Sequence, residues 1–252
     1  MSFRIATLNI EQDHKRWHER RELIVEQWGK LRPDLLAVNE LCVPDQSGRW
    51  LQRAARERLG LEYRLIQQSK PGDESPIQGE GLLTRYAPIE IGNLDYRSHN
   101  CVALVTRFDI EGRLVDVYVT HLIAVRVDES ARREQVERLL EWVRTRDAVG
   151  AADAAIVCGD FNAAPEKPST QQMAKVFHAT QFEPTAFTPL REVSGEPTHP
   201  DWPRFDRCID YIWIKGKIRC EASGLCFNQP AADDPDLRPS DHVGVRADLS
   251  IS

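Results

Sequence analysis

The order of hydrophobic and polar residues along the chain predicts short strands interleaved with a few longer helices. Segments that alternate apolar and polar residues, or that form short apolar runs, are typical of strands. Such segments lie at residues 3–9, 35–38, 63–67, 80–85, 154–158, 209–214, 217–222 and 243–249. Apolar residues spaced three and four positions apart predict helices at residues 17–31, 50–59 and 129–146.

Residues 101–122 are predicted to form a β-hairpin. An apolar strand runs through Val102 and Phe108 into the turn at Glu111-Gly112-Arg113, and a second apolar strand leads back out. Strands in hairpin-like pairs, mixed with amphipathic helices, favour an α/β (α+β) fold in which sheets pack face to face and helices lie outside. No internal repeat, low-complexity tract or linker interrupts the pattern. Residues 1–252 are therefore expected to form a single domain.

The composition narrows the class of protein. Hydrophobic residues make up 41% of the 252 residues, enough for a sizeable core, and the formal net charge is −6. A protein that binds long duplex DNA through many phosphates usually has a basic face. The negative net charge therefore weighs against tight, nonspecific DNA binding. No apolar run approaches the ~20 residues that span a bilayer, and the first ten residues read as a strand rather than a signal sequence. We expect a cytoplasmic protein without a transmembrane segment.

The cysteines point to buried, reduced thiols. Most lie within apolar, strand-like segments, and no two form the Cys-x-x-Cys pair that is typical of zinc sites. They are Cys42, Cys101, Cys158, Cys208, Cys220 and Cys226. We therefore expect small, inert core residues rather than a zinc site.

Polar residues that can bind a metal or a phosphate follow directly after several predicted strands. They are Asn9, Glu40, His121, Asp160, Asn162 and Asp210, while Asp241-His242 precede the last strand. Strand ends are rigid positions from which side chains can converge on one site. This placement predicts a single functional site assembled from distant parts of the chain.

Each residue, taken alone, also has a structural explanation. A carboxylate after a strand, such as Glu40, commonly serves as a turn or capping residue. Asp160-Phe161-Asn162 could form a simple turn, and His121 could be a hydrogen-bonded core histidine. Asp210 is different, because a carboxylate inside the apolar segment 209–212 is costly to bury unless it has a partner.

The order of the motifs resembles the endonuclease/exonuclease/phosphatase superfamily, which has the DNase I-like fold. The motifs are Thr7-Leu8-Asn9-Ile10, Pro33-Asp34-Leu35-Leu36-Ala37-Val38-Asn39-Glu40, Thr120-His121-Leu122, Arg132-x-x-Gln135, Gly159-Asp160-Phe161-Asn162, Ile209-Asp210-Tyr211-Ile212 and Ser240-Asp241-His242. The resemblance covers nearly the whole chain. It implies a four-layered α/β sandwich, in which two face-to-face, mainly antiparallel β-sheets are flanked by helices.

The resemblance also implies a metal site. Glu40 matches the family's principal ligand of a Mg²⁺ ion, for which Mn²⁺ can substitute, and Asn9 and Asp241 match residues at the same site. A hard divalent cation of this kind prefers oxygen ligands together with waters and substrate phosphate. His242 matches a histidine that pairs with the carboxylate at Asp210. Whether one or two metal ions act stays open.

The remaining roles concern the attacking water and the phosphate. Asp160 matches the residue that orients or deprotonates the water, Asn162 would donate a hydrogen bond to a phosphate oxygen, and His121 matches a position that binds phosphate or assists the leaving group. With Asn9 and His242 they form the implied substrate-binding set. Whether His242 or Asp160 is the general base stays open.

Three further features accompany the resemblance. Asn39 stands where the family commonly has glutamine, which keeps the amide but shortens its reach. Arg97 and His99 are the candidates for a basic residue that many nucleolytic relatives carry, although both are slightly displaced. Arg132 and Gln135 lie one helical turn apart and are expected to brace the scaffold.

The sequence thus predicts a Mg²⁺-dependent hydrolase that cleaves phosphate esters by in-line attack of water, either a nuclease-type phosphodiesterase or a phosphatase. Its substrate could be nucleic acid, a lipid headgroup or a small ester such as a nucleotide. The alternative is a catalytically silent module that binds a phosphate ligand on the same fold. A serine or cysteine hydrolase lacks a nucleophile-elbow motif, and no protein partner is predicted.

Substrate choice is expected to depend on three variable loops, at residues 69–80, 92–100 and 163–205. The last is polar and rich in proline, with room for one helix. Trp202, Phe205 and His199 could contact a substrate there, or could form a small apolar cluster beneath the loop.

Overall fold

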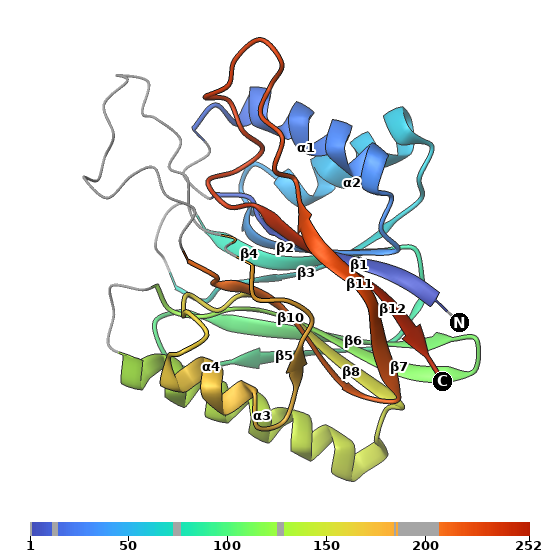
Figure 1. The fold of residues 1–252 in the computed structure, drawn as a ribbon, viewed down its shortest axis with the longest axis vertical. Coiled ribbons are helices and arrows are strands. Elements are labelled where there is room, and N and C mark those ends of the chain that lie inside the picture. Colours follow the sequence, from blue (N-terminus) through green and yellow to red (C-terminus); the bar gives the residue numbers. More distant parts are fainter. Residues whose placement is uncertain (1, 12–14, 73–76, 125–128, 184, 186–206) are drawn as a thin grey trace.

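The computed structural model of the chain describes residues 2–11, 15–72, 77–124, 129–183, 185 and 207–252. Two six-stranded sheets lie face to face, and helices cover the outer face of each sheet (Figure 1). The layers are therefore helix, sheet, sheet and helix. This arrangement confirms the predicted four-layered α/β sandwich.

The two sheets differ in strand order. The first sheet runs, in space, β11 (Ile218–Cys226), β12 (Gly244–Ile251), β1 (Ser2–Asn9), β2 (Leu35–Cys42), β4 (Gln78–Thr84) and β3 (Arg64–Ser69). The second runs β5 (Pro88–Asp95), β6 (Val102–Ile110), β7 (Arg113–His121), β8 (Ala154–Asp160), β10 (Asp210–Gly216) and β9 (His178–Ala179). Helices α1 (Trp17–Leu31) and α2 (Ser47–Leu59) cover the first sheet, and α3 (Glu129–Gly150) and α4 (Pro168–Met173) cover the second (Figure 1).

Each sheet contains one parallel pair of strands among otherwise antiparallel neighbours in the described residues. The pairs are β1 with β2 and β7 with β8, with Asn9 beside Asn39 and His121 beside Asp160. Because the strands of a parallel pair end at the same edge of a sheet, each pair brings the carboxyl ends of two strands together. Four of the polar motifs found in the sequence begin at these ends.

The core lies in three layers that match the apolar faces of the elements. Ile5 and Leu82 of the first sheet pack with Val117 and Ile156 of the second to fill the space between the sheets. Trp28 of α1 belongs to a second cluster on the outer face of the first sheet. A third cluster lies between α3 and the second sheet, and includes Val136, Leu139, Val157 and Trp213. Helices α1 and α3 are therefore held by their apolar stripes, as the helical spacing predicted.

Most predicted elements are confirmed, with shifts of a few residues at their ends, but the expected loop at 92–100 is wrong in its first half. Strand β5 continues to Asp95 and pairs with β6 at the edge of the second sheet. Ile89 and Ile91 on this strand are exposed. Residues 92–95 read Gly-Asn-Leu-Asp, and Gly, Asn and Asp are uncommon in strands, so this part of the edge strand resembles a loop in the sequence.

The cysteines agree with the sequence prediction. All six are free thiols, and five of them are buried, while Cys220 is half-buried. Burial raises the pKa of Cys158 and Cys226, which favours the neutral thiol. In the described parts of the chain, no helix is both long enough and apolar enough to traverse a bilayer.

Candidate active site

A β-bulge in β2 gives Asn39 and Glu40 different surroundings. The pairing of β2 with β4 shifts by one residue between Val38 and Leu41, and Glu40 adopts a left-handed φ of 60°. Asn39 is fully buried, whereas the Glu40 side chain keeps 20% of its surface exposed. Bulges often re-aim a side chain next to an active site. The bulge leaves the Glu40 carboxylate accessible at the end of the sandwich.

Asn9 connects the carboxylates of the two sheets. Its Nδ2 donates to Glu40 Oε1 at 3.0 Å and to Asp160 Oδ2 at 3.2 Å. Its Oδ1 accepts the backbone N–H of Glu11 at 3.0 Å. An amide oxygen has two lone pairs, so one remains for a cation. Asn9 therefore orients two carboxylates and can still offer one oxygen ligand.

Asp160 is fixed from several directions at the end of β8. Its Oδ1 accepts the backbone N–H of Asn162 at 2.7 Å, and its own N–H donates to Asn39 Oδ1 at 3.1 Å. The antiparallel register of β8 and β10 places Asp160 directly opposite Asp210. The buried carboxylate is thus held in one orientation beside a second acid.

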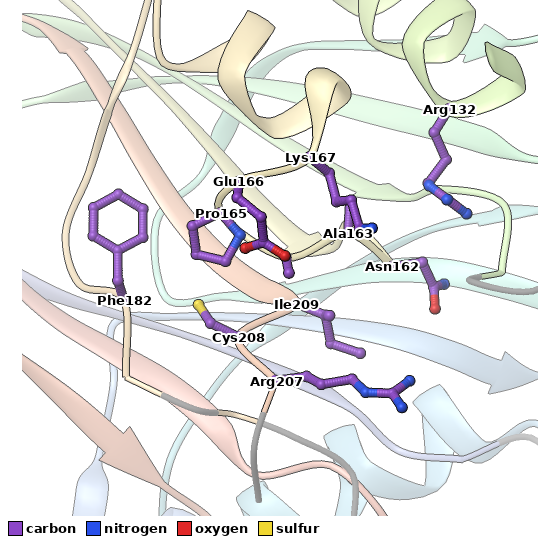
Figure 2. Close-up of a pocket in the computed structure, with 11 residues that line it drawn as sticks. Arg132, Asn162, Ala163, Pro165, Glu166, Lys167, Phe182, Arg207, Cys208 and Ile209 are labelled. Atoms are coloured by element: carbon purple, nitrogen blue, oxygen red, sulfur yellow. The ribbon is translucent and has the colours of Figure 1, made fainter. Parts of the chain in front are cut away.

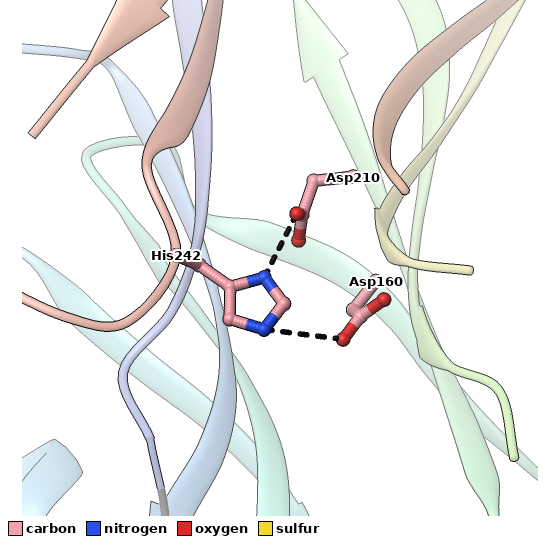
Figure 3. Close-up of side chains that lie close together, drawn as sticks. All are labelled: Asp160, Asp210 and His242. Carbon is pink, nitrogen blue, oxygen red and sulfur yellow. Dashed lines mark hydrogen bonds and ion pairs between the residues drawn. The ribbon is translucent and has the colours of Figure 1, made fainter. Parts of the chain in front are cut away.

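His242 lies between these two acids (Figure 3). Its Nδ1 is 2.9 Å from Asp210 Oδ2, and its Nε2 is 3.8 Å from Asp160 Oδ2. All three side chains are buried. The structure therefore brings together Asp160, Asp210 and His242 from three separate segments, and supplies the partner that the buried Asp210 requires.

Two members of this group, His242 and Asp160, have raised pKa values. Burial works against the charged form of His242, but the negative charges of Asp210 and Asp241 outweigh it and raise the pKa of His242 well above the ordinary value. Burial, together with the charge of Asp210, raises the pKa of Asp160 to about 8. At neutral pH the histidine is therefore a cation, and Asp160 is a carboxyl group that exchanges a proton readily.

His121 and Asn162 form a second contact group next to Asp160. Asn162 Nδ2 is 3.1 Å from His121 Nε2 and donates to the Leu122 carbonyl at 3.0 Å. His121 Nε2 also lies 3.5 Å from Asp160 Oδ2 and 3.9 Å from Glu40 Oε1. Burial, and then the charge of Lys70, lower the pKa of His121 well below its ordinary value. His121 is therefore a neutral imidazole at the centre of the predicted residues.

A buried glutamate and a half-buried lysine next to His121 were missed in the sequence analysis. Lys70 Nζ lies 3.4 Å from His121 Nδ1 and 3.5 Å from Glu80 Oε1, and Glu80 is fully buried. Asn39 Nδ2 donates to Glu80 Oε2 at 2.5 Å and to the Thr120 carbonyl at 3.0 Å. The short amide of Asn39 thus reaches both sheets. The available signal was a glutamate inside the predicted strand 80–85, since a buried carboxylate needs a partner.

Glu11 is a second residue that the sequence analysis missed. It has a left-handed φ of 62° and is buried, with Oε2 lying 3.6 Å from Arg20 Nη2. Burial, followed by the charge of Asp241, raises the pKa of Glu11 to about 8. Burial also raises the pKa of Asp241, and the charge of Glu40 adds to this rise. Glu11, Glu40 and Asp241 therefore form one acidic group around Asn9.

The donor chemistry of this region fits a hard divalent cation. Asp160, Asp210 and His242 offer ligand atoms within 4.8 Å of one another. In that trio, however, a charged imidazole already pairs with Asp210, and a cationic histidine is no metal ligand. Glu40, Asp241 and the oxygen of Asn9 instead supply the carboxylate and amide ligands that Mg²⁺ prefers. A cation there would also relieve the repulsion between the acids.

The scaffold residues and the basic candidates have other surroundings. Arg132 and Gln135 are buried rather than on a helix surface, and they hold the segment after β7. Arg132 Nη1 donates to the Ala124 carbonyl at 2.9 Å, and Gln135 Oε1 accepts the N–H of Ile123 at 2.9 Å. Arg97 and His99 are exposed, and Trp202, Phe205 and His199 lie outside the described residues.

A pocket of about 460 Å³ opens beside Asn162 (Figure 2). Ala163 and Pro165 form part of its wall, and the exposed ring of Phe182 lies on the side opposite Asn162 in this view. Lys167 and Arg207 add exposed positive charge, and Glu166 adds one exposed carboxylate. The pocket is therefore large enough to accommodate a small organic group beside Asn162.

Sequence comparison connects this arrangement with known proteins. The sequence model described as "Endonuclease/Exonuclease/phosphatase family" matches residues 6–242. Nocturnin from Homo sapiens is 26% identical over 268 residues, a match that covers 94% of this chain and 59% of the relative. The chain thus spans about three fifths of the length of that relative.

Solved structures share the fold over the full chain. The human Nocturnin catalytic domain with a bound sulfate anion has a TM-score of 0.75 and 23% identity, covering 100% of this chain and 95% of that chain. D. rerio TDP2 complexed with single strand DNA product has a TM-score of 0.76 and 15% identity, covering 99% of both chains. ANGEL2, a 2',3'-cyclic phosphatase, in complex with adenosine-2',3'-vanadate, has a TM-score of 0.74 and 16% identity, covering 100% and 96%. At these identities the likeness establishes the DNase I-like sandwich fold alone.

Proposed function

The chain belongs to the endonuclease/exonuclease/phosphatase family, and from this membership we propose that it hydrolyses phosphate esters with the help of a bound Mg²⁺ ion. The single observation that carries the proposal is the position of His242 between Asp210 and Asp160, in the same site as Glu40. This group combines a fixed cation, a proton acceptor and accessible oxygen ligands. Those are the components that water attack on phosphorus requires.

The cation site consists of Glu40, Asp241 and the free lone pair of Asn9. The Glu40 side chain keeps 20% of its surface exposed, and Asn9 orients its carboxylate. The bound ion would neutralise negative charge on the non-bridging oxygens of the phosphate. Mn²⁺ is expected to substitute for Mg²⁺, because both accept oxygen ligands.

Asp160 is the proposed general base. Its pKa of about 8 lies near neutral pH, where proton transfer by a positioned side chain is most effective. Hydrogen bonds from Asn9 and from the Asn162 backbone hold its two oxygens in place. A water held by Asp160 can therefore lose its proton as it attacks the phosphorus from one fixed direction.

His242 and His121 have different proposed tasks. His242 keeps its positive charge because it is paired with Asp210, so it stabilises the charge that builds on the phosphate. His121 is neutral, and its Nε2 lies next to the Asn162 amide. Once a phosphate displaces this contact, Asn162 can donate to a phosphate oxygen and His121 can assist the leaving group.

The substrate is proposed to be a nucleotide or nucleic acid phosphate ester. The pocket beside Asn162 offers about 460 Å³ with one exposed aromatic ring and two exposed cations, which suits a nucleoside with further phosphate groups. Two proteins with the same fold, D. rerio TDP2 and ANGEL2, have been solved in complex with a single strand DNA product and with adenosine-2',3'-vanadate. We propose that residues 1–252 act as one catalytic domain, and cytoplasmic location stays a prediction.

A metal-dependence assay tests the proposal. The purified chain should hydrolyse bis-p-nitrophenyl phosphate with Mg²⁺ or Mn²⁺, lose this activity in EDTA, and regain it when the metal is restored. Glu40→Ala should lower the rate on the order of 10²-fold or more while its circular dichroism spectrum is unchanged. A screen across single-stranded DNA, RNA, cyclic nucleotides and sphingomyelin then distinguishes the substrate classes.

A catalytically silent binding module would give a different result in these assays. Such a protein would bind adenosine monophosphate by calorimetry but hydrolyse none of these esters at any Mg²⁺ or Mn²⁺ concentration. Full activity in EDTA, or in Glu40→Ala, would contradict the proposed role of the cation.

A further inference from the structure

Arg20 is a fully buried cation on helix α1, and the catalytic roles above do not use it. A buried guanidinium is costly unless hydrogen bonds compensate for the lost water. Arg20 Nε donates to the Lys15 carbonyl at 2.5 Å, and its Nη1 donates to the carbonyls of Ile10 at 2.8 Å and Pro239 at 3.1 Å. The fork therefore holds three backbone carbonyls at once.

Two of these carbonyls belong to the segments that carry the proposed cation ligands. Ile10 directly follows Asn9, and Pro239 is two residues before Asp241. These segments come from opposite ends of the sequence, and the segment between β11 and β12 lies beside α1 in Figure 1. Arg20 bridges the two segments, because its Nη1 donates to both carbonyls. Nη1 cannot move away from either carbonyl without losing one of these hydrogen bonds.

A hydroxyl group makes a second tie between the same segments. Ser240 Oγ donates to the Asn9 carbonyl at 2.6 Å and accepts the backbone N–H of His242 at 3.2 Å. Arg20 Nη2 also lies 3.6 Å from Glu11 Oε2, so its charge faces the acidic group. The guanidinium and the hydroxyl thus fix the spacing between Asn9 and the Asp241-His242 pair.

We propose that Arg20 is a positioning residue of the active site, whose buried guanidinium holds the segment of Asn9 and Glu11 against the segment of Asp241 and His242. This inference rests on the proposed function, because it concerns the same cation site. An arginine makes the Nη1 bridge while its Nε also donates to the Lys15 carbonyl, which fixes the plane of the guanidinium, whereas a lysine ammonium is a single point of donors on a flexible stem. Loss of the fork would leave the ligands present but spaced too loosely for a small cation.

The test measures metal binding apart from catalysis. Arg20→Gln and Arg20→Lys are compared with the unmodified chain by electron paramagnetic resonance of free and bound Mn²⁺. Both variants should bind Mn²⁺ on the order of 10- to 100-fold more weakly, the usual effect of removing a residue that orients metal ligands. Hydrolysis at limiting Mg²⁺ should fall in proportion, and saturating Mg²⁺ should restore most of it. Arg20→Lys, which keeps the charge, carries the test if Arg20→Gln unfolds.

Arg107→Gln is the matched control. Arg107 is a mostly buried arginine that bonds Asp116 at 2.6 and 2.7 Å on the second sheet. Its loss should lower the melting temperature while Mn²⁺ affinity stays within about twofold of the original value, as expected for independent sites.

The outcomes separate this inference from the proposed function. If the unmodified chain takes up no Mn²⁺, the proposed function fails and the inference fails with it. If the unmodified chain binds Mn²⁺ and a folded Arg20 variant binds it equally well, only the role of Arg20 is overturned. An equal loss of Mn²⁺ affinity in Arg107→Gln would also overturn it, because the effect would then be general destabilisation.

Discussion

At the scale of single residues, burial acts on acids and histidines in opposite ways, and neighbouring charges decide the result. His121 and His242 are both buried, yet the pKa of His121 is lowered and that of His242 is raised. The difference follows from their neighbours, because His242 contacts Asp210 whereas His121 faces the cation of Lys70. The site thus contains one charged and one neutral imidazole.

Asp210→Asn tests the charged imidazole directly. The amide keeps the shape of the side chain but removes the charge that stabilises the His242 cation, so kcat should fall on the order of 10²-fold. Mn²⁺ affinity should change little, because Asp210 is not among the proposed ligands. Steady-state kinetics at saturating Mg²⁺ give the kcat value. A kcat within about threefold of the original, in a variant that keeps its fold, would contradict the role of Asp210.

The sequence identified residues of this site better than it identified their contacts. Glu40, Asp160 and Asp210 were predicted from their order after strands, and the structure brings Asp160 and Asp210 together with His242. Glu11 and Glu80 were missed, because nothing in their local sequence shows which side chains of other elements surround them. Partners that come from distant segments are not encoded in a local pattern.

At the scale of elements, the parallel pair β7 and β8 must approach closely for Asp160 to reach its place. Gly159 has a φ of 131°, and a Cβ at this position would lie 2.0 Å from the Thr120 carbonyl oxygen. A side chain would therefore push the two strands apart. The glycine before Asp160 is a requirement of strand packing as well as of the motif.

Gly159→Ala should consequently lower the free energy of unfolding by roughly 1–3 kcal/mol and should also displace Asp160 and reduce kcat. Gly112→Ala is the matched control, since Gly112 has a φ of 81° but open space where the Cβ would be. The control should show the backbone strain without the clash and should keep full activity. Urea unfolding and kinetics measure both effects. Equal loss of stability in the two variants would argue against the clash.

The ion pair between β1 and β12 provides a prediction about pH. Arg4 Nε and Nη2 donate to the two oxygens of Asp248 at 2.6 and 2.9 Å. These hydrogen bonds lower the pKa of Asp248 below its ordinary value. Because the folded pKa lies below the unfolded value of about 3.9, the stabilisation is present at neutral pH. It is lost as the pH falls below about 4 and through the folded pKa.

Asp248→Asn should therefore reduce the free energy of unfolding by about 1 kcal/mol near neutral pH, and the difference should shrink as the pH approaches about 3. Urea unfolding across this pH range measures it. In an Arg4→Met background the same substitution should show a smaller pH-dependent difference, because only Arg246, 3.6 Å from Asp248, then remains as its partner. A difference that stays constant down to the lowest pH would contradict the lowered pKa of Asp248.

The elements themselves were largely predictable, and the exceptions have a common cause. The strands at 3–9 and 154–158 show clear apolar patterns because one or both faces are buried. Strand β5 and the bulge at Glu40 were not predicted, since the first lies at a sheet edge and the second depends on pairing with β4. Both depend on neighbours rather than on the local order of residues.

At the scale of the whole molecule, the candidate active site exists only because two sheets meet at one end. Glu40 and Asn9 come from the first sheet, while His121, Asp160 and Asp210 come from the second. The Asn39 side chain connects the two sheets, because it donates to Glu80 in the first sheet and accepts the N–H of Asp160 in the second. The residues therefore lie together only in the folded sandwich, because neither sheet alone carries all of them.

The same closure concentrates negative charge at the site. Burial raises the pKa values of Glu11, Asp160 and Asp241, and the negative charge of Glu40 adds to each of these rises. Concentrated like charge is unfavourable for stability, and active sites commonly accept this cost for function. A cation that binds the folded chain should offset the repulsion.

The most direct test of the account is the location of a bound cation in crystals soaked with Mn²⁺. Anomalous scattering should give a peak whose ligands include Glu40 and Asp241, with Asn9 adjacent, while His242 stays paired with Asp210. A peak elsewhere, or none at Mn²⁺ concentrations that support hydrolysis, would contradict the central claim that these side chains form a cation-assisted site for phosphate ester hydrolysis.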